Sequence, residues 1–246
     1  MARLLILGAT GSLGRHVLRQ AVAAGHDVTV FVRTPSKLPA AMRTRVATRT
    51  GDLGAGLAAD LVKAQDALIN CAGHVGDGAT FVGLVDRLVT SIDSLPIVEQ
   101  PVSWFLAGAA LLDIGSSGRR GVDLAKVAGT YWPHRDNFER LNRSRLDWRL
   151  LCPGPMVDEA PLGVDRLRVS LDVLPVEVPA SADAATESSL LSVFAPLIPQ
   201  LVVPYSDAAA LMLAHLDRGG AMSRHRIGLA LPLGTTGQKS DWRQPA

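Results

Sequence analysis

Three glycines spaced three residues apart, Gly8, Gly11 and Gly14, are the residues of this chain best suited to holding a phosphorylated ligand. A helix can hold a diphosphate at its N-terminus only where the backbone lets the free N–H groups reach the phosphates. Gly8 permits a tight turn, Gly11 removes a side chain that would block the phosphates, and Gly14 lets the helix lie close to the sheet. The glycine pattern therefore predicts a diphosphate-binding turn.

The segments around these glycines support the same prediction. Residues 4–7 form a short apolar run, which is typical of a strand buried on both faces of a parallel sheet. An amphipathic helical pattern follows and ends at Gly25, and residues 27–32 alternate as a second strand. A strand, a glycine turn, a helix and a second strand in this order indicate a dinucleotide-binding fingerprint. A glycine-rich turn without function is the alternative.

Arg33, directly after the second predicted strand, bears on the choice of nucleotide. An acidic residue at this place would accept hydrogen bonds from the adenosine ribose and repel a 2′-phosphate. Arg33 instead offers a fork of donors to a phosphate, and Lys37 follows closely. The sequence therefore favours NADP(H) over NAD(H), unless both cations are simply solvated loop residues.

The ends of the third and fourth predicted strands supply further candidates. Asp52 follows residues 45–50, and it either meets the adenine amino group or acts as a turn residue or helix cap. Small residues after the strand at 66–71 leave room for the ribose and the diphosphate at the switch point of the sheet. The expected cofactor-binding residues are Gly8, Thr10, Gly11, Ser12, Leu13, Gly14, Arg33, Lys37, Asp52, Leu53, Cys71, Ala72, Gly73 and Pro153.

Beyond this first part, the chain continues to alternate between strand and helix patterns. We expect strands at 102–112 and 146–152, an edge strand at 225–231, and helices at 80–95, 136–145 and 206–216. The fold class is thus α/β, with a doubly wound parallel sheet of the Rossmann type.

Regular alternation breaks down from residue 156 to residue 200. Residues 169–178 are compatible with one strand that Pro175 interrupts, and a small, polar stretch with further prolines follows. A segment of this kind after the last core strand commonly covers the carboxyl edge of the sheet, so we expect 156–200 to be a substrate lid.

Composition restricts the classes of function. The chain has 246 residues, 48% hydrophobic and 20% charged, which indicates one globular domain over residues 1–246. With 25 basic and 23 acidic residues, it offers no case for nucleic acid or a membrane surface. Cys71 and Cys152 suggest neither a disulfide framework nor a metal site, and no apolar run reaches the length of a membrane helix. We expect a cytoplasmic location.

Several motifs in this order resemble the short-chain dehydrogenase/reductase superfamily: GATGSLGR, the Arg33 strand end, GDL, DALINCAG and LDWRLLCPGPM. More narrowly, the chain is similar to the atypical branch that contains NmrA-like and biliverdin/flavin reductase-like proteins. The resemblance is best over residues 3–157. It implies a seven-stranded parallel sheet with helices on both sides, which binds NADP(H) across the carboxyl ends of its strands.

The chain departs from this superfamily at the catalytic positions. Typical members have a Ser at the end of the fifth strand and a Tyr-x-x-x-Lys on the next helix, where the Tyr is the general acid. Here the end of the fifth strand has no residue with a hydroxyl group, and the residue four positions after Tyr131 is Arg135 instead of Lys. Pro133 argues against a regular helix between them. Tyr131 is therefore either a proton donor or a structural aromatic residue.

Two histidines are the other candidates for a proton donor. His74 follows the fourth strand at the mouth of the expected crevice, and His134 lies on the segment that normally lines the substrate side. Each is either a donor or a bystander.

These observations predict an NADPH-dependent oxidoreductase that passes hydride to a small acceptor: a flavin, a quinone or a carbonyl. Flavins and quinones need no dedicated acid, because solvent can protonate them, so the missing residues favour them over ketones. The alternative is a non-catalytic NADP(H)-binding regulator of the NmrA kind. A sugar-nucleotide epimerase is less favoured, since that relative has a larger C-terminal domain. The sequence does not determine the oligomeric state.

Overall fold

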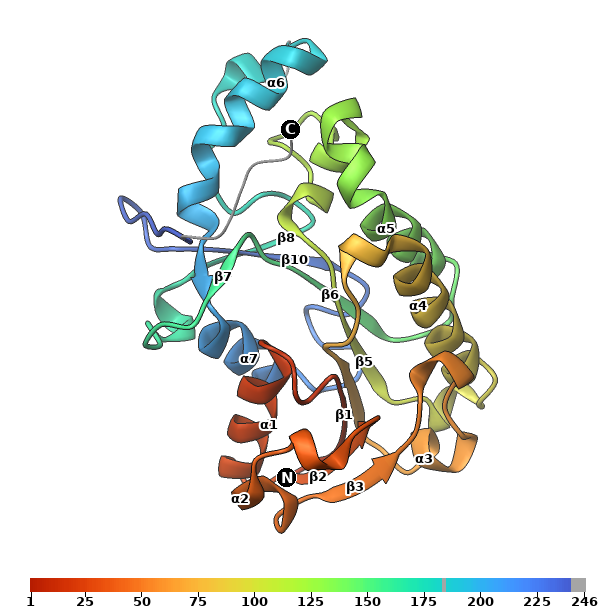
Figure 1. Ribbon diagram of the computed structural model, residues 1–246. Helices are drawn as coiled ribbons and strands as arrows, with labels where there is room; N and C mark the ends of the chain where they lie inside the picture. Colours follow the sequence, from red (N-terminus) through yellow and green to blue (C-terminus); the bar gives the residue numbers. More distant parts are fainter. Residues whose placement is uncertain (183–184, 240–246) are drawn as a thin grey trace.

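A mostly parallel β-sheet runs through the centre of the chain, with helices on both of its faces (Figure 1). This computed structural model describes residues 1–182 and 185–239. In that part of the chain the main sheet has eight strands, in the order β3-β2-β1-β4-β5-β6-β10-β8. The predicted doubly wound Rossmann fold is therefore confirmed.

The strands are short and mostly buried. Their bounds are β1 (Arg3–Leu7), β2 (Asp27–Val32), β3 (Ala47–Thr50), β4 (Ala67–Asn70), β5 (Val102–Leu106), β6 (Trp148–Cys152), β8 (Arg168–Leu171) and β10 (Arg226–Ala230). A separate pair is formed by β7 (Met156–Val157) and β9 (Val203–Pro204). The α-helices are α1 (Gly14–Ala23), α2 (Ala40–Arg43), α3 (Ala59–Lys63), α4 (Gly78–Asp93), α5 (Ala125–Asn142), α6 (Glu187–Phe194) and α7 (Tyr205–Ala214).

The order of the strands reverses direction at β1, which lies between β2 and β4. Leu7 pairs with Phe31 on one side and with Asn70 on the other, so all three strands end at the same edge of the sheet. Ligands of open α/β sheets bind at the carboxyl ends of strands around such a reversal. The fold therefore brings the glycine turn after β1 next to the residues that follow β2 and β4.

Alternation along β1 explains how one strand serves two hydrophobic layers. Leu5 and Leu7 pack with α4 and α5 on one face, whereas Leu4 and Ile6 pack with α1 and α7 on the other. Figure 1 shows these two pairs of helices on opposite sides of the sheet. Successive residues of β1 thus face opposite hydrophobic layers, which is why the strand is apolar at every position from Leu4 to Leu7.

The predicted fifth strand, at 102–112, was too long. β5 ends at Leu106, and a short 3-10 turn, Ala109–Leu111, follows it. Leu111 and Leu112 are fully buried although they lie outside the sheet, so the apolar run reflects burial and not strand structure. Periodicity alone cannot distinguish the two.

The helix predicted at 136–145 begins at Ala125 and contains Pro133. The expectation that Pro133 would prevent a regular helix between Tyr131 and Arg135 was therefore wrong. Proline in a helix removes one hydrogen bond, which costs about 3 kcal/mol when nothing compensates. Here Pro133 is buried, and a Cβ atom on Gly78 of α4 would lie 2.8 Å from its ring. Close packing of α4 against α5 offsets the lost bond.

The segment predicted as an edge strand at 225–231 is an inner strand. β10 lies parallel to β6, and β8 pairs with its other side in the antiparallel direction. The strand expected at 169–178 is confined to β8, because Asp172 adopts a positive φ of 65° and turns the chain away. The C-terminal part of the sheet thus has an antiparallel eighth strand beyond the seven-stranded parallel sheet that the resemblance implies.

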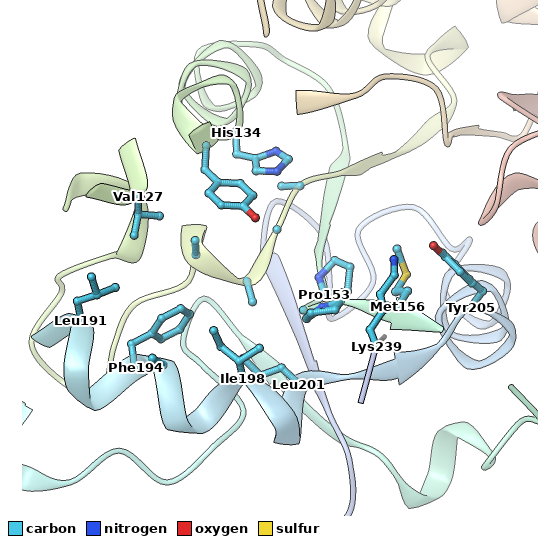
Figure 2. Close-up of a pocket in the computed structure, with 18 residues that line it drawn as sticks. Val127, His134, Pro153, Met156, Leu191, Phe194, Ile198, Leu201, Tyr205 and Lys239 are labelled. Atoms are coloured by element: carbon cyan, nitrogen blue, oxygen red, sulfur yellow. The ribbon is translucent and has the colours of Figure 1, made fainter. Parts of the chain in front are cut away.

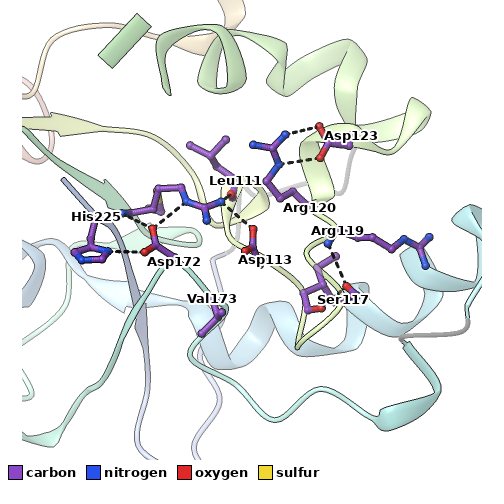
Figure 3. A network of polar contacts seen from close by, with 12 residues as sticks. Leu111, Asp113, Ser117, Arg119, Arg120, Asp123, Asp172, Val173 and His225 are labelled. Carbon is purple, nitrogen blue, oxygen red and sulfur yellow. Dashed lines mark hydrogen bonds and ion pairs between the residues drawn. The ribbon is translucent and has the colours of Figure 1, made fainter. Parts of the chain in front are cut away.

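A polar network holds this added strand in place (Figure 3). Arg226 on β10 donates to Asp172 after β8 (Nε to Oδ1, 3.1 Å) and to Asp113 after β5 (Nη1 to Oδ1, 2.9 Å). The same Nη1 donates to the carbonyl oxygen of Leu111 at 2.8 Å, and His225 pairs with Asp172. One guanidinium therefore ties β8, β10 and the segment after β5 together.

No helix in the described ranges is both long enough and apolar enough to cross a membrane. The cytoplasmic location stays a prediction.

Asp172→Asn tests the contribution of the network to stability. Burial raises the pKa of the Asp172 carboxyl, but hydrogen bonds from the Arg226 amide and from the His225 and Arg226 side chains outweigh burial and hold that pKa below its usual value. A carboxyl with a lowered pKa stabilises the fold above its unfolded-state pKa and loses this effect as the pH falls through its folded-state pKa. We expect the substitution to cost about 1–2 kcal/mol at pH 7, since about a third of the side chain is exposed, and less below about pH 4.

Urea unfolding at pH 7 and at pH 3.5 measures this difference. Glu159→Gln is the control, because Glu159 is exposed and has no ion pair within the described residues. An equal cost at both pH values would contradict the assigned network.

Candidate functional site

The glycine turn is held by close backbone contacts. Gly8 has a φ of 72°, and a Cβ atom on it would lie 2.7 Å from the backbone of Cys71 and of Ala72. A Cβ atom on Gly14 would lie 2.0 Å from the carbonyl oxygen of Gly8. Both glycines are thus required for α1 to start directly above the end of β1.

Gly11 differs from these two glycines. The nearest atom to a Cβ on Gly11 would be the Gly8 carbonyl oxygen, at 3.3 Å, and Gly11 is exposed. Packing within the protein therefore does not require a glycine at position 11, and the space beside Gly11 is open to a ligand.

The start of α1 has the properties of an anion site. The Gly11 amide donates to the Gly8 carbonyl at 2.9 Å, and within the described chain no side chain caps the helix at Leu13 and no acidic residue lies in its first turn. The first N–H groups of a helix have no partner inside the helix and carry its positive end. Thr10, Gly11 and Ser12 are exposed here, so a diphosphate fits this turn.

A cavity of about 760 Å³ extends from this turn across the ends of β2, β3 and β4. Eight of the predicted cofactor residues line it: Gly8, Thr10, Arg33, Lys37, Asp52, Leu53, Ala72 and Gly73. Gly11, Ser12, Leu13 and Gly14 form the turn at its edge. Cys71 does not line the cavity, although Ala72 and Gly73 directly after it do. Burial raises the pKa of the Cys71 thiol to about 12, which makes it unreactive near neutral pH.

Three positive side chains line this cavity, together with the carboxylates of Asp52 and Asp77. Arg33, Lys37 and Arg87 line it and are exposed, and the described residues give none of them an ion pair. The carboxylate of Asp52 accepts from the Gly54 amide at 2.7 Å, so its predicted role as a cap is confirmed. Asp77 likewise caps α4 by accepting from the Thr80 amide.

Arg87 is a cavity residue that the sequence reasoning missed. The hydrophobic periodicity of α4 predicted that Arg87 lies on the solvent side of the helix, and the larger cavity lies on that same side. The signal available was the position of α4, which begins soon after β4 at the switch point of the sheet.

A second cavity, of about 290 Å³, lies at the ends of β5 and β6 (Figure 2). Its walls come from α5, from the segment 191–201 and from the turn after β6. The lining residues are Ala107, Gly108, Ala109, Ala110, Val127, Tyr131, His134, Pro153, Gly154, Pro155, Met156, Leu191, Phe194, Ala195, Ile198, Leu201, Tyr205 and Lys239. This cavity is predominantly apolar and aromatic, as expected of a site for a small organic ligand.

Two of the three predicted proton donors meet in the second cavity. The rings of Tyr131 and His134 stack with their centroids 5.9 Å apart, and Phe81 meets His134 edge-on. Only 6% of His134 is exposed, and its Nδ1 atom has no partner within the described residues. Burial lowers the pKa of His134 to about 4, so the imidazole is neutral near pH 7.

His74 lies apart from this pair. It lines the larger cavity, and its Nδ1 atom accepts a hydrogen bond from the Gly76 amide at 2.9 Å. The structure thus gives His74 a capping role on the nucleotide side and does not bring it to Tyr131 and His134.

The two cavities flank the start of α1. Gly8 and Thr10 line the larger one, while Tyr205 lines the smaller one and stacks on His16 in the first turn of α1 at 5.9 Å. Pro153, predicted for the cofactor, lines the smaller cavity. A molecule whose diphosphate lies on the helix N-terminus can therefore place one end in each cavity.

Comparison with known proteins agrees with this geometry. Residues 8–181 match the model of a family described as NAD(P)H-binding. The chain belongs to this NAD(P)H-binding family. The match starts at the first glycine of the turn and includes the strand ends that line the two cavities, which confirms the predicted resemblance at this level.

Solved structures of distant relatives have the same fold. A protein from Lactobacillus casei is 18% identical, with a TM-score of 0.70, and the match covers 94% of this chain and 99% of that one. A candidate NADH-flavin reductase from Streptococcus pneumoniae is 19% identical, with a TM-score of 0.70 and coverage of 94% and 100%. A short-chain dehydrogenase/reductase (wide type) from Veillonella parvula, solved with NADP, is 17% identical, with a TM-score of 0.63 and coverage of 98% and 100%.

Alanine substitutions at Gly11 and Gly14 distinguish a glycine that leaves room for a ligand from a glycine that the packing of the protein requires. Gly14→Ala places a methyl group on the Gly8 carbonyl, so we expect a loss of several kcal/mol of stability or no folded protein. Gly11→Ala introduces only one tight contact, so we expect a cost below about 1 kcal/mol but at least a tenfold weaker affinity for pyridine nucleotides. Thermal unfolding and calorimetric titration measure the two effects.

Gly129→Ala is the control for adding a methyl group, because a Cβ atom on Gly129 would meet nothing within 4 Å and Gly129 lies on α5, outside the glycine turn. Unchanged nucleotide affinity in the Gly11→Ala variant would contradict the assigned diphosphate position.

Proposed function

We propose that this NAD(P)H-binding protein is an NADPH-dependent reductase that passes hydride to a small, ring-shaped acceptor. The observation that carries the proposal is the apolar cavity next to the anion site at the start of α1. When bound, NADPH supplies the hydride, and the protein supplies orientation and a site that excludes water.

The larger cavity supports the choice of NADPH over NADH. Arg33 and Lys37 would bind a 2′-phosphate on the adenosine, with Arg87 reaching the same cavity from α4. The amides at the start of α1 would hold the diphosphate. Asp52 and Leu53 would lie beside the adenine, since both line this cavity.

The smaller cavity supports an acceptor that needs little acid catalysis. Ala107, Gly108 and Ala109 stand where typical relatives of the superfamily carry a serine hydroxyl. His134 lines the cavity and is neutral near pH 7, so its imidazole can donate one hydrogen bond to an acceptor oxygen or nitrogen. In this proposal Tyr131 shapes the cavity by stacking on His134. Quinones and flavins fit these residues better than ketones do.

Residues 156–200 act as the substrate lid in this proposal. Leu191, Phe194, Ala195 and Ile198 come from this segment and line the cavity. Figure 2 shows Leu191, Phe194 and Ile198 along one wall of it. Opening at α6 would admit the acceptor without disturbing the nucleotide cavity.

The absence of the usual hydroxyl at the end of β5 also favours a second function. A non-catalytic regulator that senses NADP(H) would keep the nucleotide cavity and need no proton donor. The reductase would consume NADPH, whereas the regulator would only bind it.

Turnover separates the two functions. We expect NADPH oxidation, followed by its absorbance, with quinones and flavins and little with simple ketones. Tyr131→Phe should lower kcat by less than about tenfold, because a general acid contributes about 10²–10⁴-fold where it is needed. Tight binding of NADPH without turnover of any acceptor would contradict the reductase and favour the regulator.

Binding tests the cofactor preference independently of turnover. We expect NADPH to bind more tightly than NADH. Arg33→Asp should remove most of that preference, and Arg87→Ala should weaken NADPH by about tenfold with little effect on NADH. Arg43→Ala is the control, as Arg43 is exposed and lines neither cavity. Equal affinities for both nucleotides in the parent protein would contradict the assigned 2′-phosphate site.

A further inference from the structure

One charged side chain reaches the apolar cavity. Of the described residues that line it, Lys239 alone carries a charge at neutral pH, since burial keeps His134 neutral. In Figure 2, Lys239 lies beside Met156 and Tyr205, across the cavity from His134. The predicted lid does not supply it: Lys239 comes from the chain after β10.

Backbone contacts bring Lys239 to this place. The Gly237 amide donates to the Pro199 carbonyl oxygen at 2.8 Å, and the Leu231 amide donates to the Gln200 carbonyl oxygen at 2.8 Å. Gly237 also lies so close to Val202 that a Cβ atom on it would be 3.0 Å from the Val202 Cβ. The segment 231–239 is thus attached along residues 199–202, and Lys239 follows its last attachment point.

The ammonium group of Lys239 has no counter-ion among residues 1–182 and 185–239. Within the described ranges it makes no ion pair and no hydrogen bond, and the side chain is half-buried. A cation held against an apolar surface loses solvation without gaining a partner, which is unfavourable unless a ligand supplies the opposite charge. The cavity therefore has a place for one anionic group.

We propose that the acceptor has an apolar ring system and one phosphate or carboxylate group, and that Lys239 binds that group. This inference rests on the proposed reductase function and names its substrate class. The aromatic and aliphatic walls take the ring, and the neutral imidazole of His134 meets a neutral polar atom on it. Lys239 holds the charged group at the opposite side of the cavity.

The other possible source of the anion is the diphosphate of the cofactor. Tyr205, which neighbours Lys239 in Figure 2, stacks on His16 in the first turn of α1. Arg15 and His16 of that turn are both paired with Asp158. The two sources predict different effects of removing the Lys239 charge, so one set of titrations distinguishes them.

Riboflavin and its 5′-phosphate, FMN, form a matched pair of probes, because they share the ring system and differ in one phosphate group. Flavin fluorescence measures their binding with and without NADP⁺, and calorimetry measures NADPH binding. The variants are Lys239→Met, the conservative Lys239→Arg, and Lys126→Met as a control at an exposed position on α5 that lines neither cavity.

We expect the parent protein to bind FMN at least about tenfold more tightly than riboflavin. Lys239→Met should reduce this ratio to below about two, through weaker FMN binding alone. Lys239→Arg should retain most of the preference, and Lys126→Met should change nothing. The KM for FMN in NADPH oxidation should rise in Lys239→Met, whereas the KM for riboflavin and the affinity for NADPH should not.

Equal binding of the two flavins by the parent protein would overturn the inference. A loss of NADPH affinity in Lys239→Met with an unchanged flavin ratio would also overturn it, and would assign the ammonium to the cofactor diphosphate. Lys239-dependent binding of FMN without any NADPH oxidation would support the anion site and contradict the reductase.

Discussion

The close contact between the backbone of Gly8 and that of Gly14 is the constraint on which the rest of the site depends. It sets the first turn of α1 directly above the end of β1, where a Cβ atom at either position would meet backbone atoms. The N–H groups of this turn consequently face the switch point of the sheet, where the order of strands reverses at β1. The larger cavity borders this turn, and Tyr205 of the smaller cavity stacks on His16 just after it, so a diphosphate held there would determine where the two ends of a dinucleotide can lie.

The first half of the fold could be predicted from sequence because local signals there agree with the tertiary structure. A glycine turn, an amphipathic helix and strands that end in small residues each have a physical cause that acts within a few residues. The errors arose where long-range packing decided the outcome. Leu111 and Leu112 are apolar because they are buried beside the sheet, and Pro133 is tolerated because α4 packs closely against α5.

The same distinction applies to the site. The geometry of the glycine turn was predictable, because a turn that can hold a diphosphate needs a strict backbone geometry over a short stretch. Arg87 and Lys239 were not, since each reaches its cavity only through tertiary structure: one from the solvent side of α4, the other from the chain after β10. His74 and His134 were equal candidates by sequence, but they lie in different cavities. Residues on loops and lids follow no regular hydrophobic periodicity, so their sequence says less about where they lie in the structure.

A crystal structure with NADP⁺ tests the central claim most directly. The account predicts a diphosphate on the amides at the start of α1, with the 2′-phosphate between Arg33 and Arg87 and the nicotinamide end in the apolar cavity. A nucleotide bound elsewhere on the chain, or a diphosphate that does not contact the turn from Gly8 to Gly14, would contradict it.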